Sequence, residues 1–399
     1  MRSVELSDVL AARSLLDGVI EETPMAHSRW LSTRAKVPVY LKCENLQRTG
    51  SFKIRGAYVR ISRLSAAERA RGVVAASAGN HAQGVALAAS MLDTKATIFM
   101  PEGAALPKVS ATQGYGAQVE FAGAGVTEAL EAAQQFADET GAILIHPFDH
   151  ADILAGQGTV GLEIVEQLPD VRTIMVPLGG GGLAAGISLV RERHPDVTVI
   201  GVQAEDAAAY PGSLQEGRPV AATLGSTMAD GIAVARPGDI PFEVIAAQVD
   251  HVVTVSEESM SQALVGLLER GKMLVEPSGA AAVAALLDEP GAVEGPVVAV
   301  LSGGNIDALL LLDVIRHGLV AAGRFLRLRV RITDRPGELM RLLADLAGLQ
   351  VNVLNVTHDR SAESLGVREV DVSVEGATRG PDHREDVLRR LAELGHALV

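Results

Sequence analysis

Residues 173–186 have the sequence TIMVPLGGGGLAAG, in which a short apolar run leads into four consecutive glycines. Apolar runs of this length, bounded by glycine, are typical of strands that are buried on both faces of a parallel sheet. Glycines before a helix, here expected over residues 183–193, let backbone N–H groups converge on an anion. The stretch therefore predicts a parallel α/β sheet with an anion cradle at Gly179, Gly180, Gly181 and Gly182. A tight turn without a ligand is the alternative.

The same pattern extends to both sides of this stretch. Apolar runs alternate with amphipathic helical stretches from about residue 70 to 320, which predicts an α/β domain over residues 1–322. The runs lie at residues 72–77, 96–102, 117–123, 142–148, 197–203 and 296–304.

The pattern changes near residue 324. Residues 324–332, RFLRLRVRI, alternate strictly, so the leucine, valine and isoleucine side chains are expected on one face and the arginines on the other. Such alternation is typical of a half-exposed antiparallel strand. With two helical and two further strand patterns behind it, it predicts a small α+β domain over residues 325–399.

The composition narrows the classes of partner. The chain has 399 residues and a formal net charge of −14, without a basic patch interleaved with aromatics, so nucleic acid and anionic membranes are not expected partners. No stretch approaches the roughly 18 to 20 apolar residues of a membrane span. The single cysteine, Cys43, excludes an internal disulfide and any multi-cysteine metal site, and a cytoplasmic location is expected.

One of the six lysines is distinguished by its context. Thr49-Gly50-Ser51 offers a helix N-cap, so Lys53 is expected in the first helical turn. A cation is disfavoured at a helix N-terminus, which lowers the pKa of the amine and favours its nucleophilic form. Lys53 is therefore the candidate for a covalent link to a carbonyl group, and an exposed surface lysine is the alternative.

Two polar loops follow predicted strands. SAGNH (77–81) opens a helix expected over about residues 80–92, and SGGN (302–305) ends the last apolar run. Open α/β sheets bind ligands at the carboxyl ends of their strands. Ser77 and Asn80 are therefore candidates for holding a carboxylate or a phenolic oxygen, and Ser302 for holding a ring nitrogen. Helix capping is the alternative for each.

These segments together resemble the threonine dehydratase (threonine ammonia-lyase) family, which consists of pyridoxal-phosphate (PLP) enzymes of the tryptophan-synthase-β type. The resemblance covers nearly the whole chain, and the joint order and spacing of the motifs make it specific. It implies a two-lobed catalytic domain with largely parallel sheets, the smaller lobe spanning roughly residues 50–150. The motifs are LKCENLQRTGSFKIRGA (41–57), SAGNHAQG (77–84), HPFDHADILAGQGTVGLEI (146–164), VPLGGGGLAAG (176–186), TMADGIAV (227–234), EPSGA (276–280) and LSGGN (301–305).

The resemblance also implies a role for each matched residue. Lys53 would hold the cofactor covalently and move protons at the substrate, while Phe52 would pack against the cofactor ring. Asn80 would hydrogen-bond the phenolic oxygen of the cofactor, and Ser302 its pyridine nitrogen. The loop for the substrate carboxylate would consist of Ser77, Gly79, Asn80 and His81, and the phosphate would be held by Gly179, Gly180, Gly181, Gly182 and Leu183.

The implied activity is PLP-dependent removal of water and then ammonia from L-threonine, which gives 2-oxobutyrate. L-Serine, one methyl smaller, is a second candidate substrate. Serine racemases share the scaffold but place a serine at the position of Ala78, which has no proton to exchange, so racemisation is disfavoured. A serine dehydratase or serine racemase-like enzyme and a catalytically silent amino-acid sensor are the alternatives.

No metal site is predicted. The segment HPFDHAD (146–152) contains two histidines and two aspartates, but their spacing matches no metal-ligand motif, so an ordinary polar turn is expected. The stretch GVQAEDAAAYP (201–211) resembles the divalent-metal site of serine racemases at Glu205. Pro211, however, stands where a second carboxylate is expected.

The C-terminal residues resemble an ACT domain through VRITDRPGELMRLLADL (330–346) and VNVLNVTHDR (351–360). Such domains commonly pair across a dimer and bind an amino acid near the DRPGEL turn. The resemblance therefore implies an amino-acid effector and a homo-oligomer, either a dimer or a tetramer. The final strand is nearly absent, and a dimerisation module without a ligand is the alternative.

Overall fold

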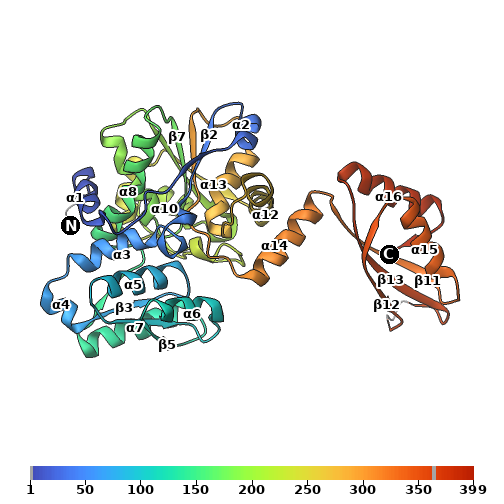
Figure 1. Cartoon of the computed structure of the whole chain (residues 1–399), viewed down its shortest axis with the longest axis horizontal. Coiled ribbons are helices and arrows are strands. Elements are labelled where there is room, and N and C mark those ends of the chain that lie inside the picture. Colours follow the sequence, from blue (N-terminus) through green and yellow to red (C-terminus); the bar gives the residue numbers. More distant parts are fainter. Residues whose placement is uncertain (1–2, 362–364) are drawn as a thin grey trace. The chain divides into compact units, whose positions relative to one another are not determined.

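The computed structural model describes residues 3–361 and 365–399, and the chain divides into two compact units between Ala308 and Leu309 (Figure 1). The first unit contains two separate, mainly parallel sheets, and the second contains one antiparallel sheet. This confirms the predicted α/β class with a small α+β domain at the C-terminus. In the described part of the chain, no helix has the length and apolar character needed to cross a membrane.

The larger sheet of the first unit has the strand order β1-β2-β10-β7-β8-β9. All neighbouring pairs in it are parallel except β1 with β2. Helices cover both faces: Ile174 and Val176 pack with residues of α1, α8 and α9, while α13 contacts the other face. The strands are β1 (Met25–His27), β2 (Val39–Lys42), β7 (Thr173–Pro177), β8 (Thr198–Ala204), β9 (His251–Val255) and β10 (Val297–Val300).

The smaller sheet is parallel throughout, with the order β5-β4-β3-β6. The residues of β3 alternate between two apolar clusters. Val73 and Ala75 pack with α3 and α5, and Val74 and Ala76 pack with α7. This sheet forms the lobe that is drawn in light blue to teal in Figure 1, around β3 and β5. Its strands are β3 (Val73–Ala76), β4 (Ala96–Met100), β5 (Gln118–Phe121) and β6 (Ile143–Leu144).

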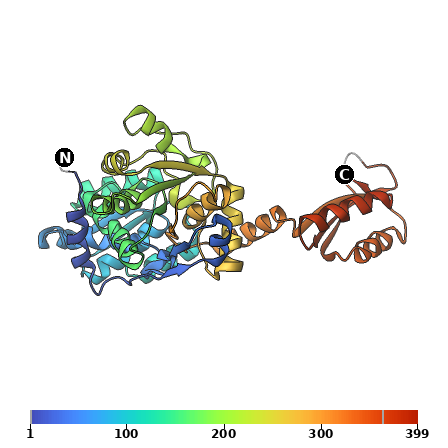
Figure 2. The same ribbon diagram turned by 90° about the horizontal axis from the view of Figure 1, so that it is seen from above.

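The helices of the first unit connect successive strands and pack on the two sheets (Figures 1 and 2). The longest is α8, whose glycines let it approach α3 and α9 closely: a Cβ at Gly156 would lie 2.5 Å from Cα of Gly56. The α-helices are α1 (Leu6–Leu16), α2 (Arg29–Ala35), α3 (Lys53–Ser62), α4 (Ala66–Arg71), α5 (Asn80–Met91), α6 (Leu106–Gly114), α7 (Val126–Thr140), α8 (Ala151–Gln167), α9 (Gly182–Ser188), α10 (Ala209–Glu216), α11 (Asp239–Gln248), α12 (Glu257–Gly266) and α13 (Pro277–Asp288). The helix α14 (Ala308–Ala321) begins at the last residue of the first unit and belongs otherwise to the second unit.

The second unit is an antiparallel sheet with the order β12-β13-β11-β14, as expected for an ACT-like domain. The alternation in β11 (Phe325–Thr333) places its leucine, valine and isoleucine side chains in the apolar core, as predicted. The helices α15 (Glu338–Gly348) and α16 (Pro381–Glu393) contribute Leu342, Leu346, Val387 and Leu391 to that core. The other strands are β12 (Asn352–Asp359), β13 (Glu369–Ala377) and the two-residue β14 (Ala397–Leu398).

Candidate active site

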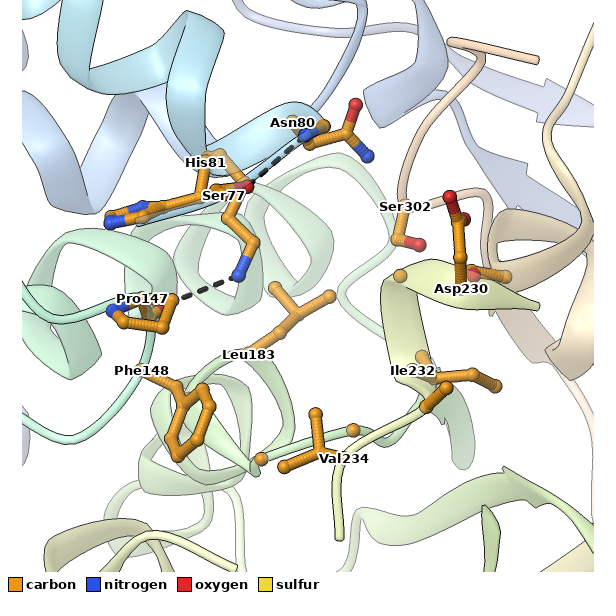
Figure 3. Close-up of a pocket in the computed structure, with 18 of the residues that line it drawn as sticks. Ser77, Asn80, His81, Pro147, Phe148, Leu183, Asp230, Ile232, Val234 and Ser302 are labelled. Carbon is orange, nitrogen blue, oxygen red and sulfur yellow. Dashed lines mark hydrogen bonds between the residues drawn. The ribbon is translucent and has the colours of Figure 1, made fainter. Parts of the chain in front are cut away.

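A pocket of about 250 Å³ lies where the strand ends of the two sheets of the first unit face each other. Figure 3 shows Ser77, Leu183 and Ser302 surrounding the same space, although they come from three distant parts of the chain. The lining residues include every site residue expected from the sequence: Phe52, Lys53, Ser77, Gly79, Asn80, His81, Gly179, Gly180, Gly181, Gly182, Leu183 and Ser302.

Backbone pairing brings the lysine segment to the serine loop. Ser51 and Gly303 form an isolated antiparallel β-bridge, and the backbone N–H of Phe52 donates to the carbonyl of Ser302 at 3.2 Å. Because Ser51 is extended in this bridge, its hydroxyl caps no helix, and the predicted N-cap at 49–51 is wrong. Phe52 occupies the N-cap position instead, and Lys53 is the first residue of α3.

The amine of Lys53 is held inside the pocket. Its Nζ donates to the carbonyl of Pro147 at 3.1 Å and lies 5.1 Å from the centre of the Phe52 ring. Burial lowers the pKa of Lys53 to about 8, although the nearby carboxyl of Glu276 opposes this. A substantial fraction of the amine is therefore neutral at pH 7 to 8, which is the form that can attack a carbonyl carbon.

The segment that opens α5 forms the wall beside this amine. The hydroxyl of Ser77 accepts a hydrogen bond from the backbone N–H of Gly79 at 3.1 Å. Nε2 of His81 lies 2.8 Å from the carbonyl of Ile145 and therefore donates to it. Burial, reinforced by the charge of Lys53, lowers the pKa of His81 to about 3, so this side chain is neutral at physiological pH.

The glycine loop has a backbone that larger residues could not adopt. Gly181 has a φ of +104°, and a Cβ there would lie 2.0 Å from the hydroxyl of Tyr210. A Cβ at Gly180 would lie 2.4 Å from the ring of Phe148. Tyr210 also donates its hydroxyl to the carbonyl of Gly180 at 3.2 Å, which fixes the loop against α10. The four glycines line the pocket and carry no side chains that could cover their backbone.

Several lining residues carry polar groups that the sequence analysis did not single out. Glu276 accepts a hydrogen bond from Asn80, and Nδ2 of Asn305 donates to Oδ1 of Asn80. The hydroxyl of Ser278 is buried and has no hydrogen-bond partner within residues 3–361 and 365–399. Lys108 pairs with Asp230 at 2.7 Å. Glu276 and Ser278 lie in the EPSGA motif (276–280), which is the feature of the sequence that could have identified them as pocket residues. The contact between Glu276 and Asn80 could not be predicted, because the two residues are 196 positions apart in the chain.

The histidines and aspartates of residues 146–152 have structural roles. Asp149 accepts from the backbone N–H groups of Asp239 and Ile240 at the start of α11. His150 caps α8 through the N–H of Asp152, whose carboxylate pairs with two arginines of α3 and its C-cap. Within the described residues, no group of three or more potential ligands is arranged to hold a metal ion.

Comparisons with known proteins agree with this arrangement. A family model for pyridoxal-phosphate dependent enzymes matches residues 16–303. The chain is 47% identical over 379 residues to the L-threonine ammonia-lyase of Geobacter sulfurreducens, with 94% of each chain covered. It is 45% identical over 394 residues to the L-threonine ammonia-lyase of Thermotoga maritima, with 98% of each chain covered.

A solved structure shares the fold of the first unit. The processed form of threonine deaminase isoform 2 from Solanum lycopersicum matches with a TM-score of 0.75 at 38% identity, over 78% of this chain and 92% of that one.

The pocket fits the cofactor of this family. It offers an amine with a lowered pKa at Lys53, a glycine loop open to a phosphate, and buried hydroxyls at Ser278 and Ser302. An unpartnered buried hydroxyl is costly unless a ligand completes its hydrogen bonds. The matched region, the pocket geometry and the identity to near full-length relatives lead to one conclusion: this chain belongs to the family of pyridoxal-phosphate-dependent enzymes.

Proposed function

We propose that this chain is a threonine ammonia-lyase, which converts L-threonine to 2-oxobutyrate and ammonia. The observation that carries the proposal is a pocket in which Lys53, the glycine loop and Ser302 converge while the residue after Ser77 is an alanine. The two near full-length relatives named L-threonine ammonia-lyase support it.

The pocket residues would divide the work as follows. Lys53 would hold the cofactor, Phe52 and Asn80 would contact its ring and phenolic oxygen, and Ser302 would bind its ring nitrogen. The N–H groups of Gly179, Gly180, Gly181, Gly182 and Leu183 would bind the phosphate, because backbone donors at a helix start favour an anion. The substrate carboxylate would be bound by the loop of Ser77, Gly79, Asn80 and His81.

Pyridoxal phosphate, when bound, supplies an electron sink that makes the α-proton of an amino acid removable and lets the β-hydroxyl leave. Lys53 is the base in reach, because its amine is neutral in part at physiological pH. Ala78 has no acid–base group, so no side chain at this position can return a proton from the opposite face. Elimination is therefore expected to dominate over racemisation.

Keto-acid release tests this proposal. Purified protein with pyridoxal phosphate is expected to release 2-oxobutyrate from L-threonine, and pyruvate from L-serine within about 10- to 200-fold of the threonine rate, since a pocket discriminates weakly against one missing methyl. Chiral chromatography of the remaining substrate is expected to show no D-enantiomer. Absence of both keto acids in a protein with bound cofactor would reject the lyase, and accumulation of D-serine would favour a racemase.

The lowered pKa of Lys53 gives a pH prediction for cofactor binding. Below about pH 8 the amine is mainly protonated, so the rate of covalent attachment of pyridoxal phosphate to apo-protein should rise up to that pH and then level off. An ordinary lysine would continue to gain rate toward pH 10.5. Stopped-flow absorbance between pH 6 and 10 measures this.

The control for that experiment is pyridoxine phosphate, which lacks the aldehyde. Its binding does not need a neutral amine and should show no step near pH 8. A midpoint above pH 10 for the aldehyde would contradict the assignment of Lys53 as a sheltered amine.

The C-terminal unit is proposed as the regulatory part of a homo-oligomer, a dimer or a tetramer, that works in the cytoplasm. In the turn before α15, Asp334 pairs with Arg360, with Nε and Oδ2 3.0 Å apart. An amino-acid effector is proposed to bind near this turn. Isoleucine, added to the threonine assay, is expected to lower the rate, which would assign the enzyme to isoleucine biosynthesis. An unchanged rate across a broad isoleucine range would leave this unit a dimerisation module.

A further inference from the structure

The buried carboxyl group of Glu276 contacts the side-chain amide of Asn80 in the pocket. Glu276 precedes α13, is 5% exposed, and lines the pocket. Its Oε1 accepts a hydrogen bond from Nδ2 of Asn80 at 2.6 Å. Its backbone N–H donates to the carbonyl of Gly303 at 3.0 Å, which fixes the residue to the loop that follows Ser302. Glu276 therefore connects two segments that both face the pocket.

The hydrogen bonds around Asn80 have only one consistent direction. Nδ2 of Asn305 lies 2.6 Å from the carbonyl of Thr49, which can only accept, and 2.8 Å from Oδ1 of Asn80. Asn80 must then accept at Oδ1 and present its nitrogen to Glu276. One N–H of that nitrogen is used by the carboxyl, and the second is left for another acceptor.

The carboxyl group of Glu276 occupies space that is open only because residue 303 is a glycine. A Cβ at Gly303 would lie 2.1 Å from Oε1 of Glu276 and 3.0 Å from Nδ2 of Asn80. Any side chain at residue 303 would thus break the contact between the two groups. The glycine after Ser302 is explained by the need to admit Glu276.

The electrostatic setting makes this carboxyl unusual. Burial, with the charge of Asp230, raises the pKa of Glu276 to about 7, while Asn80, Lys108 and Lys53 act in the opposite direction. Its protonation therefore changes within the physiological pH range. Protonated or not, the oxygen facing Asn80 can still accept a hydrogen bond.

We propose that Glu276 is a positioning residue for the reaction: by accepting one N–H of Asn80, it directs the second toward the phenolic oxygen of the cofactor. This inference rests on the proposed function of the pocket and on the role of Asn80 in it. Removing Glu276 leaves the Asn80 amide held only at Oδ1 by Asn305, so its nitrogen loses the acceptor that directs the second N–H toward the cofactor. The expected loss in cofactor affinity is about tenfold, the typical effect of one hydrogen bond.

A double-mutant cycle on the full-length protein tests this with cofactor binding and absorbance as readouts. Glu276→Ala and Asn80→Ala are each expected to weaken pyridoxal phosphate binding about tenfold, and the double variant no more than about twofold further than Asn80→Ala. Exposed Glu294→Ala is the control and should bind as wild type. Additive losses, or a Glu276→Ala variant with unchanged affinity and spectrum, would overturn the proposal.

If Glu276→Ala does not fold, the Glu276→Gln variant tests the same proposal through cofactor affinity and absorbance. Glutamine preserves the acceptor but cannot titrate, so affinity should stay within about threefold of wild type, with loss of any inflection near pH 7 in the visible absorbance of the bound cofactor. A tenfold loss of affinity would contradict the proposed role. Because these readouts need no substrate, a protein that releases no 2-oxobutyrate would reject the lyase activity while leaving this inference testable.

Discussion

Keto-acid release should fall by at least about 10⁴-fold when Lys53 is replaced by alanine, because in the proposed function Lys53 supplies both the covalent attachment of the cofactor and the base beside the substrate. The structure gives the residue no substitute: its Nζ is the amine beside Phe52 and Pro147, whereas Lys108, the other lysine that lines the pocket, is paired with Asp230. Steady-state assay of 2-oxobutyrate from L-threonine measures the effect.

A control variant shows whether the loss of keto-acid release is specific to Lys53 or follows from removing any lysine. Lys95 is exposed and lies outside the pocket, so Lys95→Ala should retain full activity. Borohydride reduction of the holo-protein should attach the cofactor to the peptide that contains Lys53 in wild type and not in the variant. Activity of Lys53→Ala above about one hundredth of wild type would contradict the assigned role.

The second large effect is expected on the free energy of unfolding. It concerns a cluster of buried charges around Arg55, which lies two residues after Lys53 in α3. Arg55 is fully buried and pairs with Glu44 at 2.8 Å and with Glu163 at 2.5 Å. Lys42, also fully buried, pairs with Glu163 at 2.6 Å. The cluster joins β2, α3 and α8, so it fixes the helix that begins with Lys53. Burial alone would lower the pKa of Arg55, but the two carboxylates outweigh it and raise that pKa.

Arg55→Met is expected to destabilise the first unit by about 3–5 kcal/mol, because Glu44 would remain as a buried charge without a cationic partner. Urea unfolding of the apo-protein, followed by the fluorescence of the single tryptophan, Trp30, reports on this unit. The exposed Arg218→Met should change stability by no more than about 0.5 kcal/mol.

The physical reason is tested by a double variant. Arg55→Met with Glu44→Gln removes the uncompensated charge, so it should be more stable than Arg55→Met alone, by about 1 kcal/mol or more. Equal stability of the two proteins would show that lost packing, and not the buried charge, accounts for the cost.

Acid should weaken the same cluster. Burial would raise the pKa of Glu163, but Arg55 and Lys42 more than offset this and hold it below 4.5. A carboxyl whose pKa is lowered by folding stabilises the protein above its unfolded pKa, and that contribution is lost as the pH falls through the folded value.

The sequence was most informative where one segment carries its own signal. The glycine run after residues 173–178, the strand that precedes Ser77 and the alternation of β11 each follow from local backbone and side-chain chemistry, and the structure confirms them. The strands β1, β2 and β9 were not predicted. They are short, and β1 and β9 are only partly buried at the ends of the larger sheet, so their residues show neither a long apolar run nor clear alternation.

By itself, the sequence determined the α/β class, the antiparallel C-terminal domain, and the choice of Lys53 and the glycine loop as pocket residues, because each depends on neighbours within about ten residues. Only the tertiary structure decided which side chains hold that site in place. Ser51 pairs with Gly303 instead of capping α3, and Glu276 meets Asn80 across 196 residues of chain. Such contacts depend on how β3, β10 and α13 are brought together in the fold. Parallel sheets pair segments that are far apart in the chain, and a local sequence pattern does not show which segments will pair.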